Sequence, residues 1–289
     1  MKPIHIFLAI LVAAMWGGNF VAAKISLHTL PPLTLLAIRF AVTAAILWPF
    51  VPKPGVPSRE IFLLSSVLGV LHFGLMFAAI YWGVDLPTAV IATQLGVPFS
   101  CLLGTILFQD RIGRWRALGM FVAFIGIVVI VGTPRIVQQF WPFMVSCAAS
   151  LAWAVANIQM KRVGKVHILS LLSRLSLYAA PQLALLSLVF ESGQIGAIQT
   201  ASPEIWMAMM YTVIFSTIVG YGAWYYLLGK FPVSHVTPYS LLVPVFGIGA
   251  SQWFFHTPMS VQFMIGCALT LVGVAIIIVR RPQEGILEK

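Results

Sequence analysis

A polar phrase that could bind a small metabolite occurs twice in an otherwise apolar chain. Trp16 and Asn19 lie in MWGGNFVAAK, and Trp153 and Asn157 lie in AWAVANIQMK, so that each tryptophan precedes its asparagine by about one helical turn. A buried amide needs hydrogen-bond partners, and an indole offers a flat apolar wall with one donor. We interpret the four side chains as contacts to a substrate in a central cavity. Interhelical hydrogen bonds for the asparagines and membrane-interface anchoring for the tryptophans are the alternative interpretations.

Two arginines fall within long apolar runs. Arg39 and Arg174 each lie near the beginning of their run, in the second run of each half of the chain. A cation near the centre of a membrane helix costs roughly 3 kcal/mol on insertion scales, so its presence requires a reason. One hypothesis is that the guanidinium holds a substrate carboxylate. The other is that each arginine caps helix-end carbonyls or pairs near the membrane interface.

Further polar and aromatic side chains are expected to line the same cavity. They are His72, Tyr81, Gln94, Tyr221, Trp224, Tyr225 and Tyr239. His72 could exchange a proton near neutral pH, although a lone histidine in a membrane more often serves as a hydrogen-bonding group.

Enzymatic chemistry is not expected from this inventory. The chain has seven acidic residues, most of them in loops, and no nucleophile–base grouping or phosphate-binding loop. Cys101, Cys147 and Cys267 lie in apolar runs without metal-ligand spacing, so neither a metal, a cofactor nor a disulfide framework is predicted.

The composition indicates an all-helical membrane protein. Of the 289 residues, 60% are hydrophobic and 8% are charged, whereas soluble domains are about one quarter charged. Apolar runs near the roughly 20 residues needed to cross a bilayer recur throughout. The net charge of +10 does not indicate nucleic-acid binding, because the basic residues lie in short gaps between apolar runs.

Proline, glycine and charge divide the chain into ten expected spans. The spans are 4–24, 33–51, 60–82, 87–108, 115–132, 141–160, 168–190, 204–228, 233–255 and 260–280. The first run has no small-residue cleavage site, so we interpret it as a helix and not as a signal peptide.

The distribution of lysine and arginine predicts the orientation. With the N-terminus in the cytoplasm, cytoplasmic ends and loops hold thirteen such residues, and the opposite side holds two, Lys24 and Arg135. Positive residues concentrate on the cytoplasmic side of membrane proteins. Both termini are therefore expected in the cytoplasm.

The spans group into two halves, 4–132 and 141–280. Five spans is an odd number, so the second half enters the membrane from the opposite side, and inverted repeats of this kind are typical of secondary transporters. Gly119 and Gly126 recur with the same spacing as Gly266 and Gly273. The small-xxx-small pattern around them predicts close helix packing in the fifth and tenth spans, with a homodimer face as one use of it.

Two prolines occupy matching positions in the fourth span of each half. Pro98 and Pro244 each lie about midway along their span, so both are expected near the membrane midplane. Proline lacks an amide hydrogen and clashes with the carbonyl four residues earlier, so the carbonyls of Gln94 and Ser240 should be freed. We interpret the prolines as hinges of two gates, with static kinks as the alternative.

The segments WGGNFVAAK, LPPLTLLAIRF at 30–40 and STIVGYGAWYYLLGKFPVSHVTPYSLLVPVFGI at 216–248 resemble the EamA family of the drug/metabolite transporter superfamily. The resemblance covers nearly the whole chain as two tandem repeats. It implies ten helices around a central cavity and export of small metabolites, often amino acids. One departure is visible: an acidic residue followed by arginine, present as Asp110-Arg111, is replaced by Thr257-Pro258 in the second half.

Together, these observations and the resemblance predict a transporter in a bacterial inner membrane that exports an amino acid or a derivative by alternating access, as a monomer or a homodimer. Proton antiport and facilitated diffusion both fit the sequence. A sugar-type or broad drug exporter is the alternative within transport, and a membrane scaffold or receptor is the alternative outside it.

Overall fold

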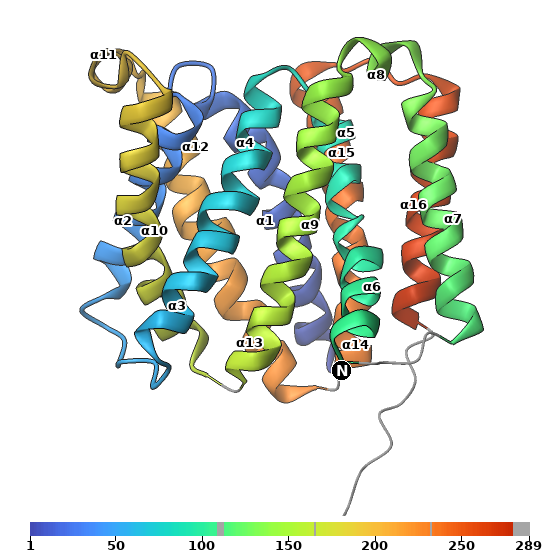
Figure 1. Ribbon diagram of the computed structural model, residues 1–289, viewed down its shortest axis with the longest axis horizontal. Helices are drawn as coiled ribbons and strands as arrows, with labels where there is room; N and C mark the ends of the chain where they lie inside the picture. The colour runs from blue at the N-terminus through green and yellow to red at the C-terminus, as the bar shows by residue number, and fades with distance from the viewer. Residues whose placement is uncertain (109–112, 165, 232, 280–289) are drawn as a thin grey trace, which may run out of the picture.

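The computed structural model describes residues 1–108, 113–164, 166–231 and 233–279, and these form a bundle of helices joined by short turns (Figure 1). The helices of the first half are α1 (Pro3–Ser26), α2 (Pro32–Leu47), α3 (Ser58–Leu64), η1 (Ser65–His72), α4 (Phe73–Tyr81), α5 (Leu86–Thr93), α6 (Gly96–Phe108) and α7 (Arg114–Val131). After the short α8 (Pro134–Gln138) come α9 (Phe140–Val163), α10 (Ile168–Phe190), α11 (Gln194–Thr200), α12 (Pro203–Tyr211), η2 (Thr212–Val219), α13 (Gly220–Lys230), α14 (Val233–Val236), η3 (Thr237–Leu241), α15 (Leu242–Phe255) and α16 (Val261–Val279). The expected acid–arginine pair, Asp110-Arg111, lies outside the described residues.

The chain is an all-helical, multi-pass membrane protein. In the described residues, eight continuous helical runs are long and apolar enough to cross a bilayer. The expected span at 33–51 is shorter, because α2 ends at Leu47, just before Pro49. The expected span at 233–255 is divided into α14, η3 and α15, with Pro238 inside the 3-10 segment. Proline cannot supply the amide that a continuous α-helix needs at such a position.

Two of the long runs contain a turn of π-helix at matching positions. η1 interrupts the third expected span and η2 the eighth, which is the third span of the second half, and both turns have the same length. The first residue of each donates its hydroxyl to the carbonyl three residues earlier: Ser65 to Phe62 and Thr212 to Met209, both at 2.7 Å. Such side-chain bonds compete with the regular backbone ladder. Hydropathy predicted both spans but not the π-turns, which occur frequently at functional sites.

The fourth span of each half is broken ahead of its proline. α5 ends at Thr93 and α6 begins at Gly96, so Pro98 lies in the first turn of α6, and Pro244 likewise lies in the first turn of α15. A first-turn residue needs no intrahelical amide partner, so proline is tolerated there. The expectation that the carbonyl of Gln94 is freed is wrong, because it accepts the amide of Val97 at 3.2 Å.

The repeated glycines pack α7 against α16. A Cβ added at Gly119 would lie 2.7 Å from the carbonyl oxygen of Gly273, and one added at Gly126 would lie 2.7 Å from that of Gly266. The helices are therefore antiparallel and in backbone contact. The glycine motif thus serves an interface within the chain, at one edge of the bundle (Figure 1).

The opposite edge of the bundle is formed by a second antiparallel pair, α2 and α10 (Figure 1). At one end, the Glu191 carboxylate accepts the amides of Leu33 and Thr34, at 2.6 and 2.9 Å, and the hydroxyls of Thr34 and Ser187, both at 2.8 Å. These contacts cap the start of α2, which has no side-chain cap of its own. At the other end, the Arg174 guanidinium lies 3.6 Å from the centre of the Trp48 ring.

Candidate functional site

Trp16 connects α1 to the π-turn of the second half. Its indole nitrogen donates to the carbonyl oxygen of Ser216 in η2 at 3.0 Å. Its ring lies 5.4 Å from Tyr221 and 5.2 Å from Trp224, between ring centres. Gly220 permits this approach, because a Cβ there would lie 2.8 Å from the indole nitrogen. The repeated tryptophan is thus held by the half of the chain to which it does not belong.

Trp153 makes the corresponding contact in the other direction. Its ring lies 5.0 Å from His72, at the end of η1. The His72 Nδ1 is 2.8 Å from the carbonyl oxygen of Ala149, one helical turn before Trp153. His72 is buried, and its ring meets the edge of Phe73 at 4.8 Å. This bond and the burial hold the imidazole in a fixed position between the two halves.

Arg39 lies between these two aromatic groups. Its side chain is 1% exposed, and its Nη2 donates to the hydroxyl of Thr217 at 2.7 Å. The guanidinium carbon lies 4.8 Å from the Phe73 ring and 5.8 Å from the Phe77 ring. Contacts therefore run from Trp153 through His72 and Phe73 to Arg39, and from Arg39 through Thr217 and its neighbour Ser216 to Trp16.

The guanidinium of Arg39 is incompletely partnered. Among the described residues, neither its Nε nor its Nη1 has a hydrogen-bond partner. Thr217 contributes a neutral acceptor, and its own proton goes to the carbonyl oxygen of Thr212 at 2.7 Å. A buried charge with unused donors is costly unless an anion reaches it. The arrangement can therefore bind a carboxylate or another anion.

The two asparagines of the repeated phrase differ in their surroundings. The Oδ1 of Asn19 is buried without a hydrogen-bond partner among the described residues. The Nδ2 of Asn157 donates to the hydroxyl of Ser100 at 3.2 Å, and its side chain is exposed. Asn19 can therefore accept a hydrogen bond from a ligand, whereas Asn157 links α9 to α6.

The other predicted site residues have varied surroundings. Arg174 stacks on Trp48 at the far end of α2, nine residues beyond Arg39, which is roughly 13 Å along a helix. Tyr81 is the last residue of α4, and it is 53% exposed. Gln94 is half-buried at the break between α5 and α6. Tyr225 and Tyr239 pack against a small apolar cluster that contains Met15, Trp224 and Leu227.

Sequence reasoning missed Ser216, Thr217, Phe73 and Phe77. Their roles depend on partners far away in the chain, such as the 178 residues between Arg39 and Thr217. The sequence did contain a signal for Ser216 and Thr217. Their hydroxyls begin the segment STIVGYGAW inside an apolar run, where each hydroxyl needs a hydrogen-bond partner.

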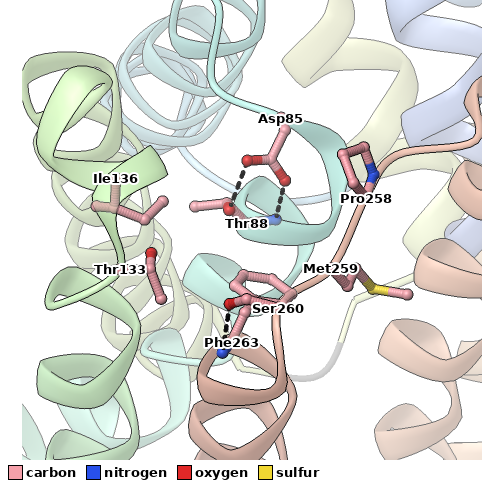
Figure 2. Close-up of a pocket in the computed structure, with 8 residues that line it drawn as sticks. All are labelled: Asp85, Thr88, Thr133, Ile136, Pro258, Met259, Ser260 and Phe263. Atoms are coloured by element: carbon pink, nitrogen blue, oxygen red, sulfur yellow. Dashed lines mark hydrogen bonds between the residues drawn. The ribbon is translucent and has the colours of Figure 1, made fainter.

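A separate cavity of about 370 Å³ lies near the beginning of α5 (Figure 2). Its walls are Asp85, Thr88, Thr133, Ile136, Pro258, Met259, Ser260 and Phe263. The Asp85 carboxylate caps α5 by accepting the amide of Thr88 at 3.1 Å and its hydroxyl at 2.9 Å (Figure 2). None of the predicted binding residues lines this cavity, and Asp85 is explained by its capping role.

Comparison with known proteins places the chain among transporters. It matches the EamA-like transporter family twice, over residues 3–132 and 140–279. It is 30% identical over 278 residues to a "Probable amino-acid metabolite efflux pump" of Salmonella typhimurium, and 30% identical over 277 residues to a protein so named in Escherichia coli. Each match covers 93% of both chains.

A more distant relative and a solved structure also match along nearly the whole chain. An "Uncharacterized transporter" of Archaeoglobus fulgidus is 26% identical over 94% of this chain and 97% of its own. A solved crystal structure superposes with a TM-score of 0.63 over 96% of both chains at 17% identity. That likeness concerns the fold alone.

Proposed function

Because the chain belongs to the EamA-like transporter family, and is thus a transporter and not an enzyme, we propose that it exports a small amino acid or amino-acid derivative by alternating access. Two relatives at 30% identity are named as probable efflux pumps for amino-acid metabolites, which supports this substrate class. A relative in Escherichia coli is named an inner membrane transporter, which supports the same membrane here.

The observation that carries the proposal is the buried guanidinium of Arg39. Its Nε and Nη1 are donors without a partner in the described part of the chain. Every α-amino acid brings a carboxylate, an anion whose two oxygens match the donors of a guanidinium. The free Oδ1 of Asn19 can accept a hydrogen bond from the ammonium group of the substrate. The rings of Trp16 and Tyr221 can face the same ammonium group.

The proposed topology is ten spans in two inverted repeats, 4–132 and 141–280, with cytoplasmic termini. The antiparallel pairs α2–α10 and α7–α16 support it, because each joins equivalent helices of the two halves in opposite directions. The N-terminus and the last residue of α16 lie at the same end of the bundle, which fits an even number of crossings (Figure 1).

The proposed cavity lining is centred on the chain of contacts between the two repeated tryptophans. Asn157, Gln94, Tyr225 and Tyr239 are proposed to extend it toward the two openings. The breaks that precede Pro98 and Pro244 are proposed to let the halves of each fourth span move separately, since both breaks interrupt regular helix bonding.

Counterflow in proteoliposomes tests the function. Vesicles loaded with one unlabelled amino acid from a panel are given the labelled compound outside, with and without a pH gradient. We expect exchange of at least one amino acid or derivative, and loss of that exchange in Arg39→Gln.

Arg174→Gln is the matched control. Arg174 has the same position in the second half as Arg39 in the first, but it lies away from the centre, so this variant should keep most of the activity. The absence of exchange for every amino acid tested, or normal exchange by Arg39→Gln, would contradict the proposal.

A further inference from the structure

We propose that the Arg39 centre is also a binding site for a small monovalent inorganic anion, such as chloride. The anion binds to the guanidinium when no substrate is bound, and the substrate carboxylate then displaces the anion. This inference rests on the proposed function, because it assigns the same donors to both anions.

The charge of the centre is not balanced by an acidic side chain. Arg39 is 1% exposed, and no carboxylate of the described residues lies within 4.0 Å of its nitrogens. A transporter must also return without its substrate. A cation left bare in an apolar interior is costly. A soluble anion removes that cost in each cycle without requiring an acidic side chain at the centre.

The walls of the centre favour a weakly hydrated anion. Phe40, Phe73 and Phe77 place rings within 5.9 Å of the guanidinium carbon, so the surroundings are mainly apolar. An apolar site favours an anion that loses its hydration shell readily and needs few donors. Chloride and bromide meet this condition, whereas sulfate and phosphate need more donors than the Nε and Nη1 that remain.

The other polar groups at the centre already have partners. The Thr217 hydroxyl already donates to Thr212 and accepts from Arg39. The His72 Nδ1 is engaged with the carbonyl oxygen of Ala149. Neither group carries a negative charge that could neutralise Arg39. The unused guanidinium donors are therefore the part of the centre that selects an anion.

A stability titration tests the site without any transport. The purified full-length protein is heated in detergent at constant ionic strength while chloride replaces sulfate, the anion that needs more donors than the site leaves unused. We expect the midpoint of thermal unfolding to rise with chloride in a saturable way. Bromide in place of chloride should act similarly.

Two variants locate the effect. Arg39→Gln should abolish the chloride-dependent rise, and Arg174→Gln should retain it. An equal rise in both variants and in the unaltered protein would assign the effect to other sites and overturn the inference, as would the absence of a saturable rise in the unaltered protein.

A competition experiment needs no variant, so it holds even if Arg39→Gln fails to fold. In counterflow by the unaltered protein, chloride should raise the half-saturating substrate concentration without changing the maximal rate. At ten times its own dissociation constant the increase should be about elevenfold by mass action. Exchange that is insensitive to chloride would overturn the anion site while leaving the proposed export intact. A saturable chloride effect on unfolding without any amino-acid exchange would instead overturn the proposed substrate.

Discussion

The indole nitrogen of Trp16 lies 3.0 Å from the carbonyl oxygen of Ser216, to which it donates a hydrogen bond between distant parts of the chain. The bond joins α1 to the π-turn η2. Thr217, which follows Ser216 in η2, accepts a hydrogen bond from the Arg39 guanidinium. The position of the central cation is thereby coupled to the repeated tryptophan of the first half.

Trp16→Phe tests this coupling. The ring stays but its donor is removed, so we expect a loss of about 1 kcal/mol in the free energy of unfolding, as for a typical hydrogen bond. Denaturant unfolding in detergent and the counterflow rate are the measurements. Trp141→Phe, at an exposed position near the start of α9, is the control. Equal behaviour of the two variants would contradict a positioning role for Trp16.

Thr217→Val tests how Arg39 is held. Valine has nearly the same shape but removes the acceptor for Nη2, leaving the buried cation without its one hydrogen-bond partner in the described residues. We expect a loss of about 1–3 kcal/mol in stability and a higher half-saturating substrate concentration in counterflow. Thr217→Ser keeps the hydroxyl and should restore both values, and its failure to do so would argue against the hydrogen bond.

Gly273→Ala tests the packing of α7 against α16. A Cβ there would collide with the backbone nitrogen of Ala123 and the carbonyl oxygen of Gly119. Overpacking of this kind costs about 1–3 kcal/mol, measured as a lower unfolding midpoint. At Gly229, in α13, a Cβ would meet no atom within 4 Å. Gly229→Ala should therefore be neutral or stabilise by up to about 1 kcal/mol, and a similar loss in both would refute the close contact.

Glu191→Gln tests the cap at the start of α2. The carboxylate accepts two amides and two hydroxyls there, and hydrogen bonds to a charged group contribute about 1.5–3 kcal/mol each. We expect a clear drop in thermal stability, since the amide side chain keeps only one acceptor oxygen. Glu204→Gln, at an exposed site in the first turn of α12, should change stability little. Indistinguishable unfolding of the two proteins would contradict the cap.

Cysteine labelling tests the inverted topology. In a background without Cys101, Cys147 and Cys267, Ile195→Cys should react with an impermeant thiol reagent in intact cells, because α11 lies on the proposed outer side. Lys53→Cys should react only after lysis. Lys53 is preferable to its neighbour Gly55, whose φ of +70° disfavours any other residue. Reaction of both cysteines in intact cells would exclude the proposed topology.

The sequence by itself determined the membrane class, the helical content and the family. Hydropathy and charge are local properties, so the apolar runs could be predicted from composition and spacing. The glycines at 119, 126, 266 and 273 also predicted close helix packing, because only small side chains allow backbones to meet. The two halves were visible because matching residues recur at nearly constant offsets.

The tertiary structure decided which of the matching residues meet. Arg39 and Arg174 have the same position in their repeats, yet one is buried beside Thr217 and the other stacks on Trp48. The π-turns and the breaks before Pro98 and Pro244 were also decided there. When a side chain's partner lies in the other half of the chain, the contact depends on how whole helices pack, and hydropathy and local spacing carry no information on that packing.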